Sequence, residues 1–462
     1  MASSPATGDH RFDVAAFIDA RAIGWREIAM LVVCSIVLFI DGFDMYFLGK
    51  IAPAVARGLG GKPVDMTAVF TWQQIGMAVG AFTMPPLADK IGRKPMLLAC
   101  LAGFGVLSLV AAFAMSLLQL TVLRGLAGIF LAGAFPIGLA LLSEMTPHHM
   151  RSPFIAISLV FLSGGNIASG AVAAWLLDLY GWQIGFVIAG VLPLLALPLL
   201  LAVPESLAFR VSRDPVDPKI ARMVRKLDRD IVFSGFERFC FGPEERSTAA
   251  GPTAILRPPY RLQTVILWAT CFLSLGNIAL LSNWLSTYFL ELGGVPIQQF
   301  AKFLMIGFTG GAIGTLTMGW FMARTNPYWL ICGFFVLDAV AITALGILPF
   351  GTGVFVGAMM AWSFAQTGGQ TGLNTLATLG YPPEMRSSGM GWASGVGRFG
   401  GILFPLVGGI ALGAALPLRI LMPIIAVPCL LVAVLIALLA IGAKRQVAAE
   451  GSFAAEHSEP VY

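Results

Sequence analysis

A six-residue pattern occurs twice in this chain, as PHHMRS at residues 147–152 and as PPEMRS at residues 382–387. Both copies read P-x-x-M-R-S, and each follows the fourth long apolar run of its half of the chain. A fainter pair follows the second run of each half, LADKIGRK at 87–94 and FMARTN at 321–326. Matches at corresponding places predict that the chain consists of two structurally similar halves.

The composition predicts a polytopic membrane protein. Of the 462 residues, 57% are hydrophobic and only 11% are charged. A soluble protein of this length cannot bury that much apolar surface. A helix needs about 20 apolar residues to cross the hydrocarbon core of a bilayer. Runs of that length predict spans at 26–48, 67–88, 94–115, 118–145, 153–178, 183–203, 261–290, 298–322, 328–349, 353–379, 387–413 and 417–442.

The expected fold is therefore an all-α integral membrane protein with twelve transmembrane helices in two pseudo-symmetric six-helix bundles. The polar segment 204–258 separates the bundles, and its stretch 218–230 is a candidate short surface helix. Parallel halves of this kind place a substrate site between them, near the midplane of the membrane. The predicted parts are an N-terminal segment (1–25), a first bundle (26–203), a linker (204–258), a second bundle (259–443) and a tail (444–462).

Basic residues predict the orientation, because cytoplasmic loops of membrane proteins are enriched in Lys and Arg. If the N-terminus is inside, the short inner loops and termini hold Arg11, Arg21, Arg26, Lys90, Arg93, Lys94, Arg151, Arg324, Arg386, Lys444 and Arg445. The outer loops hold Lys50, Arg57, Lys62, Lys302 and Arg419. We therefore expect both termini in the cytoplasm. This distribution also explains the net charge of +5 without a nucleic-acid partner.

Charges within the first and fourth spans indicate a proton-coupled step. Asp41 and Asp44 are three residues apart and share one face of the first span. Two buried carboxylates so close together can take up and release a proton. Arg124 lies about six residues, or about 9 Å, below the outer end of the fourth span, at a depth similar to that of the aspartates. A switchable Asp–Arg pair and a static ion pair are both compatible with this pattern.

The eleventh span carries Arg398, about 18 Å along the helix from Arg386 and therefore near the midplane. Its own span offers no acid, and a guanidinium at that depth suits a carboxylate ligand. Glu144 ends the fourth span at the inner side, and we expect it near Asp89, Arg93 and Arg386 rather than near substrate. Asp338, isolated in the ninth span, is interpreted as structural.

Polar and aromatic side chains recur within the spans and could line a cavity. They are Gln73, Gln74, Asn166, Asn277, Asn283, Trp284, Tyr288, Trp362, Gln366, Gln370, Asn374 and Trp392. Aromatic side chains there could stack on a planar ring, although Trp and Phe are common in membrane helices in any case. Every histidine falls in a terminus or loop, so a carboxylate is the expected proton carrier.

Nothing in the sequence predicts an enzyme, a metal site or a cofactor. The six cysteines show no CxxC spacing, and five of them lie in apolar runs, which argues against a disulfide framework. No nucleophile–base set and no phosphate-cradling loop is evident. The linker is also too short for a typical signalling domain, which argues against a membrane sensor.

The segment DKIGRK at 89–94 resembles the loop motif of the major facilitator superfamily, and RGLAG at 124–128 with Gly133 and Pro136 resembles its fourth-helix motif. The element DGFD at 41–44 resembles the aromatic acid:proton symporter family, which includes bacterial transporters for 4-hydroxybenzoate, protocatechuate, benzoate, vanillate and muconate. The resemblance implies that Asp41, Asp44 and Arg124 serve proton coupling. It further implies an inner gate formed by Asp89, Gly92, Arg93, Glu144 and Arg386.

We therefore expect a monomeric symporter that imports an aromatic carboxylate with at least one proton across the bacterial inner membrane by alternating access. Its partners would be the substrate, protons and the lipid bilayer. The expected substrate-binding residues are Arg398, Asp44, Asn277, Trp284, Tyr288, Gln366, Gln370 and Trp392. The alternative is a proton antiporter of the same superfamily that exports drugs or metabolites, although Arg398 favours an anionic substrate.

Overall fold

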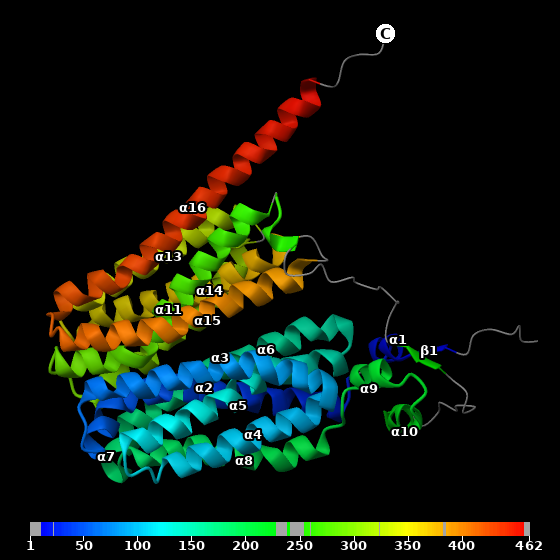
Figure 1. Cartoon of the computed structure of the whole chain (residues 1–462), viewed down its shortest axis with the longest axis horizontal. Helices are drawn as coiled ribbons and strands as arrows, with labels where there is room; N and C mark the ends of the chain where they lie inside the picture. The colour runs from blue at the N-terminus through cyan, green and yellow to red at the C-terminus, as the bar shows by residue number, and fades with distance from the viewer. Residues whose placement is uncertain are drawn as a thin grey trace, which may run out of the picture.

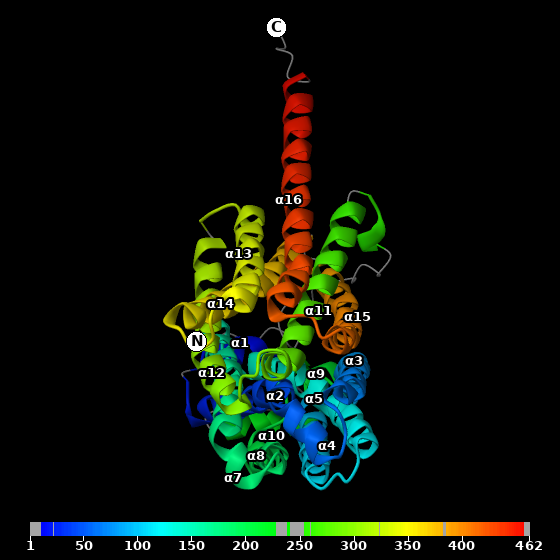
Figure 2. The same ribbon diagram turned by 90° about the vertical axis from the view of Figure 1, so that its left-hand side faces the viewer.

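The computed structural model of the chain describes residues 11–21, 23–227, 238–240, 254–258, 260–322, 324–381 and 385–456. Within these residues the architecture is almost entirely helical, and the long helices form two bundles that lie one above the other in Figure 1. Figure 2 shows the same two bundles after a turn of 90°, with α16 projecting beyond the second bundle.

Within the part of the chain that the structure describes, each bundle contains six long helical stretches, as predicted. The first consists of α2 (Trp25–Gly58), α3 (Met66–Ile91), α4 (Arg93–Ala111), α5 (Leu117–Met145), α6 (His148–Ala171) continued through η2 (Val172–Leu176) into α7 (Leu177–Tyr180), and α8 (Gln183–Ala202). The second consists of α11 (Arg261–Glu291), α12 (Ile297–Met322), α13 (Pro327–Ile347), α14 (Gly353–Leu379), α15 (Arg386–Gly413) and α16 (Leu418–Glu456).

Ten of these helical stretches, counted over the described residues, are long and apolar enough to cross a membrane. The other two, α3 and α14, have the required length but carry polar residues, among them Gln73, Gln74, Gln366 and Gln370. Gln73 and Gln366 are buried, whereas Gln74 and Gln370 line a cavity between the two bundles, so these polar side chains do not require a lipid-facing surface.

The helix pairs that pack most closely occupy equivalent places in the two bundles. In the first bundle, α2 packs on α6 and α3 on α5; in the second, α11 packs on α15 and α12 on α14. Glycines permit this approach: a Cβ at Gly76 would lie 1.9 Å from the carbonyl oxygen of Gly125, and one at Gly310 would lie 2.3 Å from that of Met360. The repeat seen in the sequence is therefore also a repeat of helix packing.

The segments outside the bundles form a small cap at one end of the first bundle. It comprises β1 (Arg11–Asp13), α1 (Val14–Asp19), α9 (Leu207–Arg213), α10 (Pro218–Leu227) and β2 (Arg238–Cys240), where β1 and β2 pair in parallel. Two short 3-10 turns, η1 (Pro63–Asp65) and η3 (Ala254–Leu256), precede α3 and α11.

The described parts of the linker, residues 204–227, 238–240 and 254–258, are partly folded onto the protein rather than being only a solvated connection. Residues 218–227 of the candidate surface helix at 218–230 form α10, and residues 228–230 lie outside the described residues. Ile220 and Val224 of α10 are fully buried in a cluster that includes Val14 and Ile18 of α1. The apolar face of α10 therefore packs on the protein.

The two bundles meet at the end opposite this cap. There α2 contacts α11, α3 contacts α15, and α6 contacts α12. Arg57 at the end of α2 forms an ion pair with Glu291 at the end of α11, and the Nε2 group of Gln298 donates to Asp178 Oδ1 at 2.5 Å. Toward the cap the helices of the two bundles diverge (Figure 1).

One residue used for the orientation was placed wrongly. Lys50 was assigned to an outer loop because the apolar run stops before it, but α2 continues to Gly58 and Lys50 is only 2% exposed. Its ammonium donates to Asn166 O at 2.8 Å, to Asn166 Oδ1 at 2.8 Å and to Ser169 Oγ at 2.6 Å. Three acceptors satisfy its three donors, which makes burial tolerable.

Candidate functional site

A cavity of about 340 Å³ lies between the two bundles. It is lined from the first bundle by α2, α3, α5 and α6, and from the second by α11, α14 and α15. Apolar side chains such as Met45, Met77, Phe135 and Leu162 form much of its wall. Its polar lining residues are Asp41, Gln74, Gln370, Asn374, Ser394 and Arg398.

Asp41 and Arg398 bring opposite charges to this cavity from opposite bundles. Asp41 comes from α2 and Arg398 from α15, and their charges interact across the cavity. Among the described residues, neither side chain forms an ion pair or a hydrogen bond. A guanidinium without a bound partner in a largely apolar cavity can accept a carboxylate in a bidentate manner.

Asp44, one helical turn from Asp41, has a different environment. Its two carboxylate oxygens accept hydrogen bonds from Arg124 of α5, at 2.9 Å from Nη1 and 2.5 Å from Nη2. The side chain of Asp44 is 2% exposed and that of Arg124 is 1% exposed, and neither lines the cavity. The guanidinium also lies over the ring of Phe186, 5.7 Å from its centroid. The predicted pairing of Arg124 with the aspartates of the first span is therefore observed for Asp44.

Amide side chains form a second polar region of the cavity. The Nε2 group of Gln370 donates to Asn374 Oδ1 at 3.0 Å, and the hydroxyl of Ser274 donates to Gln370 Oε1 at 2.6 Å. Gln74 faces the same cavity from α3 of the first bundle. These side chains can both donate and accept hydrogen bonds, so they can recognise hydroxyl groups of a ligand.

Of the residues predicted to bind substrate, Arg398 and Gln370 line the cavity, whereas Trp284 and Tyr288 do not. Trp284 Nε1 donates to the carbonyl of Pro405 at 2.9 Å, and the Tyr288 hydroxyl donates to that of Gly408 at 2.9 Å. Both aromatic side chains are fully buried between α11 and α15. In this conformation they hold two helices of one bundle together.

Asn277, Gln366 and Trp392 also lie away from the cavity. Asn277 is buried and donates to Cys429 of α16. Gln366 is buried in α14, and its Nε2 atom has no hydrogen-bond partner among the described residues. Trp392 is 47% exposed and lies against Trp268, with ring centroids 5.8 Å apart.

Three polar lining residues, Gln74, Asn374 and Ser394, were not among the predicted site residues. Gln74 and Asn374 appeared only in the wider set of polar side chains within spans, and Ser394 did not appear there. A helical spacing could have found two of them, since Asn374 follows Gln370 by one turn and Ser394 precedes Arg398 by one turn. The sequence could not tell which of the adjacent residues Gln73 and Gln74 faces the cavity, because that depends on the rotation of α3 about its axis.

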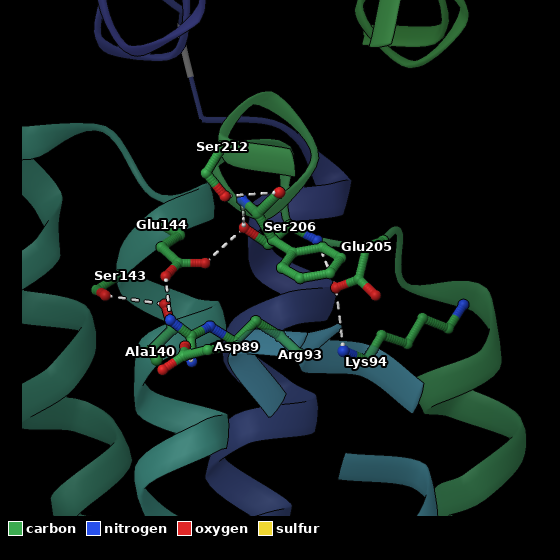
Figure 3. Close-up of polar contacts among 10 residues, drawn as sticks. Asp89, Arg93, Lys94, Ala140, Ser143, Glu144, Glu205, Ser206 and Ser212 are labelled. Atoms are coloured by element: carbon green, nitrogen blue, oxygen red, sulfur yellow. Dashed lines mark hydrogen bonds and ion pairs between the residues drawn. The ribbon is translucent and has the colours of Figure 1, made fainter. Parts of the chain in front are cut away.

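A cluster of charged side chains lies at the cap end of the first bundle (Figure 3). Arg93 at the start of α4 forms ion pairs with Asp89 of α3 at 2.5 Å and with Glu144 of α5 at 3.2 Å. The second oxygen of Glu144 accepts a hydrogen bond from the Ser206 hydroxyl at 2.5 Å. The predicted proximity of Asp89, Arg93 and Glu144 is observed, while the side chain of Arg386 lies outside the described residues.

Gly92 has a backbone requirement within this cluster. Its φ is +125°, and a Cβ there would lie 2.5 Å from Glu205 Oε2. The other carboxylate oxygen of Glu205 accepts from the backbone N–H groups of Lys94 at 3.1 Å and Ser206 at 2.9 Å. Glu205 and Ser206, which the sequence did not single out, thus attach the start of the linker to the turn between α3 and α4.

Comparison with known proteins gives three similarities. A family model described as Major Facilitator Superfamily matches residues 34–405. The gallate transporter of Pseudomonas putida is 36% identical over 438 residues, which cover 95% of this chain and 96% of that protein. The 4-hydroxybenzoate transporter PcaK of the same organism is 33% identical over 405 residues, covering 87% and 90%.

Among solved structures, the nucleoside transporter NupG superposes with a TM-score of 0.68 at 13% sequence identity. The match covers 88% of this chain and 99% of that one. At this identity the likeness concerns the fold alone.

Proposed function

This chain belongs to the Major Facilitator Superfamily, and from that membership we propose that it is a proton-coupled symporter that imports a hydroxylated aromatic carboxylate. It is an integral membrane transporter and not an enzyme. The proposal assigns it to the bacterial inner membrane, as a monomer with both termini in the cytoplasm. The observation that carries the proposal is the cavity in which Arg398 and Asp41 face each other from opposite bundles.

Arg398 is proposed to bind the substrate carboxylate. Its guanidinium lies in a cavity where Asp41 is the one acidic residue among the described residues that line it. The planar fork of an arginine matches a carboxylate in geometry as well as in charge. Cationic drugs would instead favour an excess of acids in the cavity, so Arg398 argues for an anionic substrate.

Asp41 is proposed to carry the proton. Asp41 and a bound substrate would place two carboxylates beside one guanidinium, and like charges in a poorly solvated cavity disfavour each other. Binding of the substrate anion therefore favours protonation of Asp41, which couples the two ligands. Asp44 is less suited to this role, because Arg124 already neutralises it with two hydrogen bonds.

The amide region is proposed to bind ring hydroxyls. Gln74, Gln370 and Asn374 line the cavity together with Arg398, so a rigid ring could present its carboxylate to the guanidinium and its hydroxyls to the amides. Similarity to the gallate transporter makes gallate the first candidate, with 4-hydroxybenzoate and protocatechuate next. An analogue that lacks one of these hydroxyls would leave the amide groups of the cavity without a hydrogen-bond partner. The site can therefore discriminate strongly against such an analogue.

The conformation described here is proposed to face inward. The contacts between the bundles, including Arg57 with Glu291 and Gln298 with Asp178, lie at the end opposite the cap. If the cap is cytoplasmic, this closed end is the outer one. The cluster of Asp89, Arg93 and Glu144 would then close the inner end in the opposite conformation, together with Arg386.

Uptake into proteoliposomes tests the proposal. The ligands are radiolabelled gallate, 4-hydroxybenzoate, protocatechuate, vanillate, benzoate and muconate, each with and without an inward proton gradient. We expect gradient-dependent accumulation of a hydroxylated benzoate that a protonophore abolishes. Asp41→Asn should abolish accumulation but retain binding, and Arg398→Gln should abolish binding.

Matched controls are Asp65→Asn and Arg419→Gln, which change exposed residues of the same types far from the cavity. Both should transport as the unmodified protein does. Folded protein that accumulates none of these acids, with or without the gradient, would refute import of aromatic acids. It would leave export by antiport as the next hypothesis.

A further inference from the structure

The second bundle contains a buried acid that the proposed transport mechanism does not use. Asp338 lies midway along α13, and its side chain is 1% exposed. The helix α13 packs on α16, α14 and α12, so Asp338 sits in the interior of the second bundle and outside the central cavity. From the sequence alone, Asp338 was interpreted as structural because no charged partner for it was apparent nearby.

Side chains from two other helices meet Asp338. The thiol of Cys429, in α16, donates to Asp338 Oδ2 at 3.2 Å. The Nδ2 group of Asn277, in α11, donates to Cys429 Sγ at 3.0 Å. These contacts form a short chain from an amide through a thiol to a carboxylate, and all three side chains are buried.

Two acceptor oxygens in this hydrogen-bonded group lack a donor. Asp338 Oδ1 and Asn277 Oδ1 are both buried and have no hydrogen-bond partner among the described residues. Two acceptors without a donor are unfavourable in an interior where the surrounding groups are apolar. A proton bound to the carboxylate of Asp338 would supply a hydrogen-bond donor and remove the negative charge.

No basic side chain neutralises Asp338 within the described residues. The helix α14 contains no ionisable residue. Lys302 lies in the second turn of α12 and Arg419 in the first turn of α16, whereas Asp338 lies midway along α13. The side chains of Lys444 and Arg445, later in α16, lie outside the described residues. Among the described residues, Cys429 is the one titratable group that contacts Asp338. An isolated carboxylate in such surroundings becomes neutral rather than remaining charged.

We propose that Asp338, Cys429 and Asn277 form a second proton-binding site, located in the second bundle and coupled to transport. The proton binds a carboxylate oxygen of Asp338. The coupling runs through α11, because Asn277 lies between Leu275 and Ile278, two residues that line the central cavity. Loss of the proton would change the hydrogen bonding of Asn277 and so the position of this part of the cavity wall.

Proton binding is tested without any substrate, by infrared spectroscopy of the reconstituted protein. A protonated carboxyl group gives a carbonyl band that an ionised carboxylate lacks. We expect a band that disappears in Asp338→Asn and that shifts to higher frequency in Cys429→Ala, because the thiol donor is removed. Cys100→Ala, a buried cysteine of the first bundle, should leave the band unchanged.

Coupling, which rests on the proposed function, is tested by comparing exchange with accumulation in Asp338→Asn. Exchange of labelled for unlabelled substrate across equal pH should persist. Under a gradient of about one pH unit, loss of one coupled proton should lower the accumulation ratio by about tenfold.

The outcomes separate the two proposals. An infrared band that is the same in Asp338→Asn and in the unmodified protein overturns the proton site, whatever the protein transports. Unchanged accumulation in Asp338→Asn overturns its coupling to transport. Absence of uptake in the unmodified protein refutes the proposed function, while the infrared result still decides on the proton site.

Discussion

Two aspartates one helical turn apart illustrate how strongly local surroundings decide the role of a residue. Asp44 and Arg124 form a buried ion pair with two hydrogen bonds, whereas Asp41 faces the central cavity. We therefore propose that Asp44 stabilises the fold and that Asp41 binds the proton.

The first prediction concerns this difference. Asp44→Asn should lower the free energy of unfolding by about 3–5 kcal/mol, since it leaves the guanidinium of Arg124 buried without a counter-charge. Thermal unfolding of the purified protein in detergent measures the effect. Asp41→Asn is the matched variant and should leave the unfolding temperature nearly unchanged. Equal destabilisation by both substitutions would contradict the assignment.

At the level of helices, close packing through glycines determines how the pairs α3–α5 and α12–α14 approach. Gly76 faces the backbone of Gly125, and Gly310 faces that of Met360, in equivalent places of the two bundles. Backbone cannot move aside as a flexible side chain can, so a methyl group at these positions forces the helices apart.

The second prediction follows from this packing. Gly76→Ala should destabilise the protein by about 1–3 kcal/mol, through overpacking against the carbonyl of Gly125. Gly319→Ala is the control, because a Cβ there would meet nothing within 4 Å. It should stabilise α12 by roughly 0.5–1 kcal/mol, since alanine is the better helix former. The same unfolding assay compares the two, and a similar change in both would exclude the packing argument.

At the level of the whole molecule, the contacts between bundles at the end opposite the cap hold this conformation. The ion pair of Arg57 with Glu291 connects the ends of α2 and α11, and both partners are partly exposed, at 57% and 29%. An exposed pair of this kind contributes little energy, which suits a contact that must break during transport.

The third prediction concerns the balance between conformations. Arg57→Glu should favour opening at this end, with a population shift of about fivefold or more, because an exposed pair worth up to about 1 kcal/mol is replaced by two like charges. A cysteine introduced at Ala279, which lines the cavity, reports the change through its labelling by a membrane-impermeant reagent added outside.

Combining Arg57→Glu with Glu291→Arg should restore the original labelling rate, because the pair is re-formed with reversed charges. If the double variant labels as fast as the single one, this ion pair does not contribute to closure.

The sequence by itself determined the class of the protein, its two bundles of six long helices and its superfamily. Insertion of about 20 apolar residues into a bilayer is a local property of each run, so it can be read without knowing any contact. The length of α2 was underestimated because Lys50 looked like the end of a span, while its three hydrogen-bond acceptors come from another helix.

Only the tertiary structure decided which polar residues share a cavity. That depends on the rotation of each helix about its axis and on how the two bundles meet, neither of which a single run of sequence specifies. Leu275 and Ile278 face the cavity while Asn277 between them faces Cys429, and Asp41 faces the cavity while Asp44 faces Arg124. A rotation of about 100° per residue separates neighbours on a helix, so contacts with other helices assign each side chain its role.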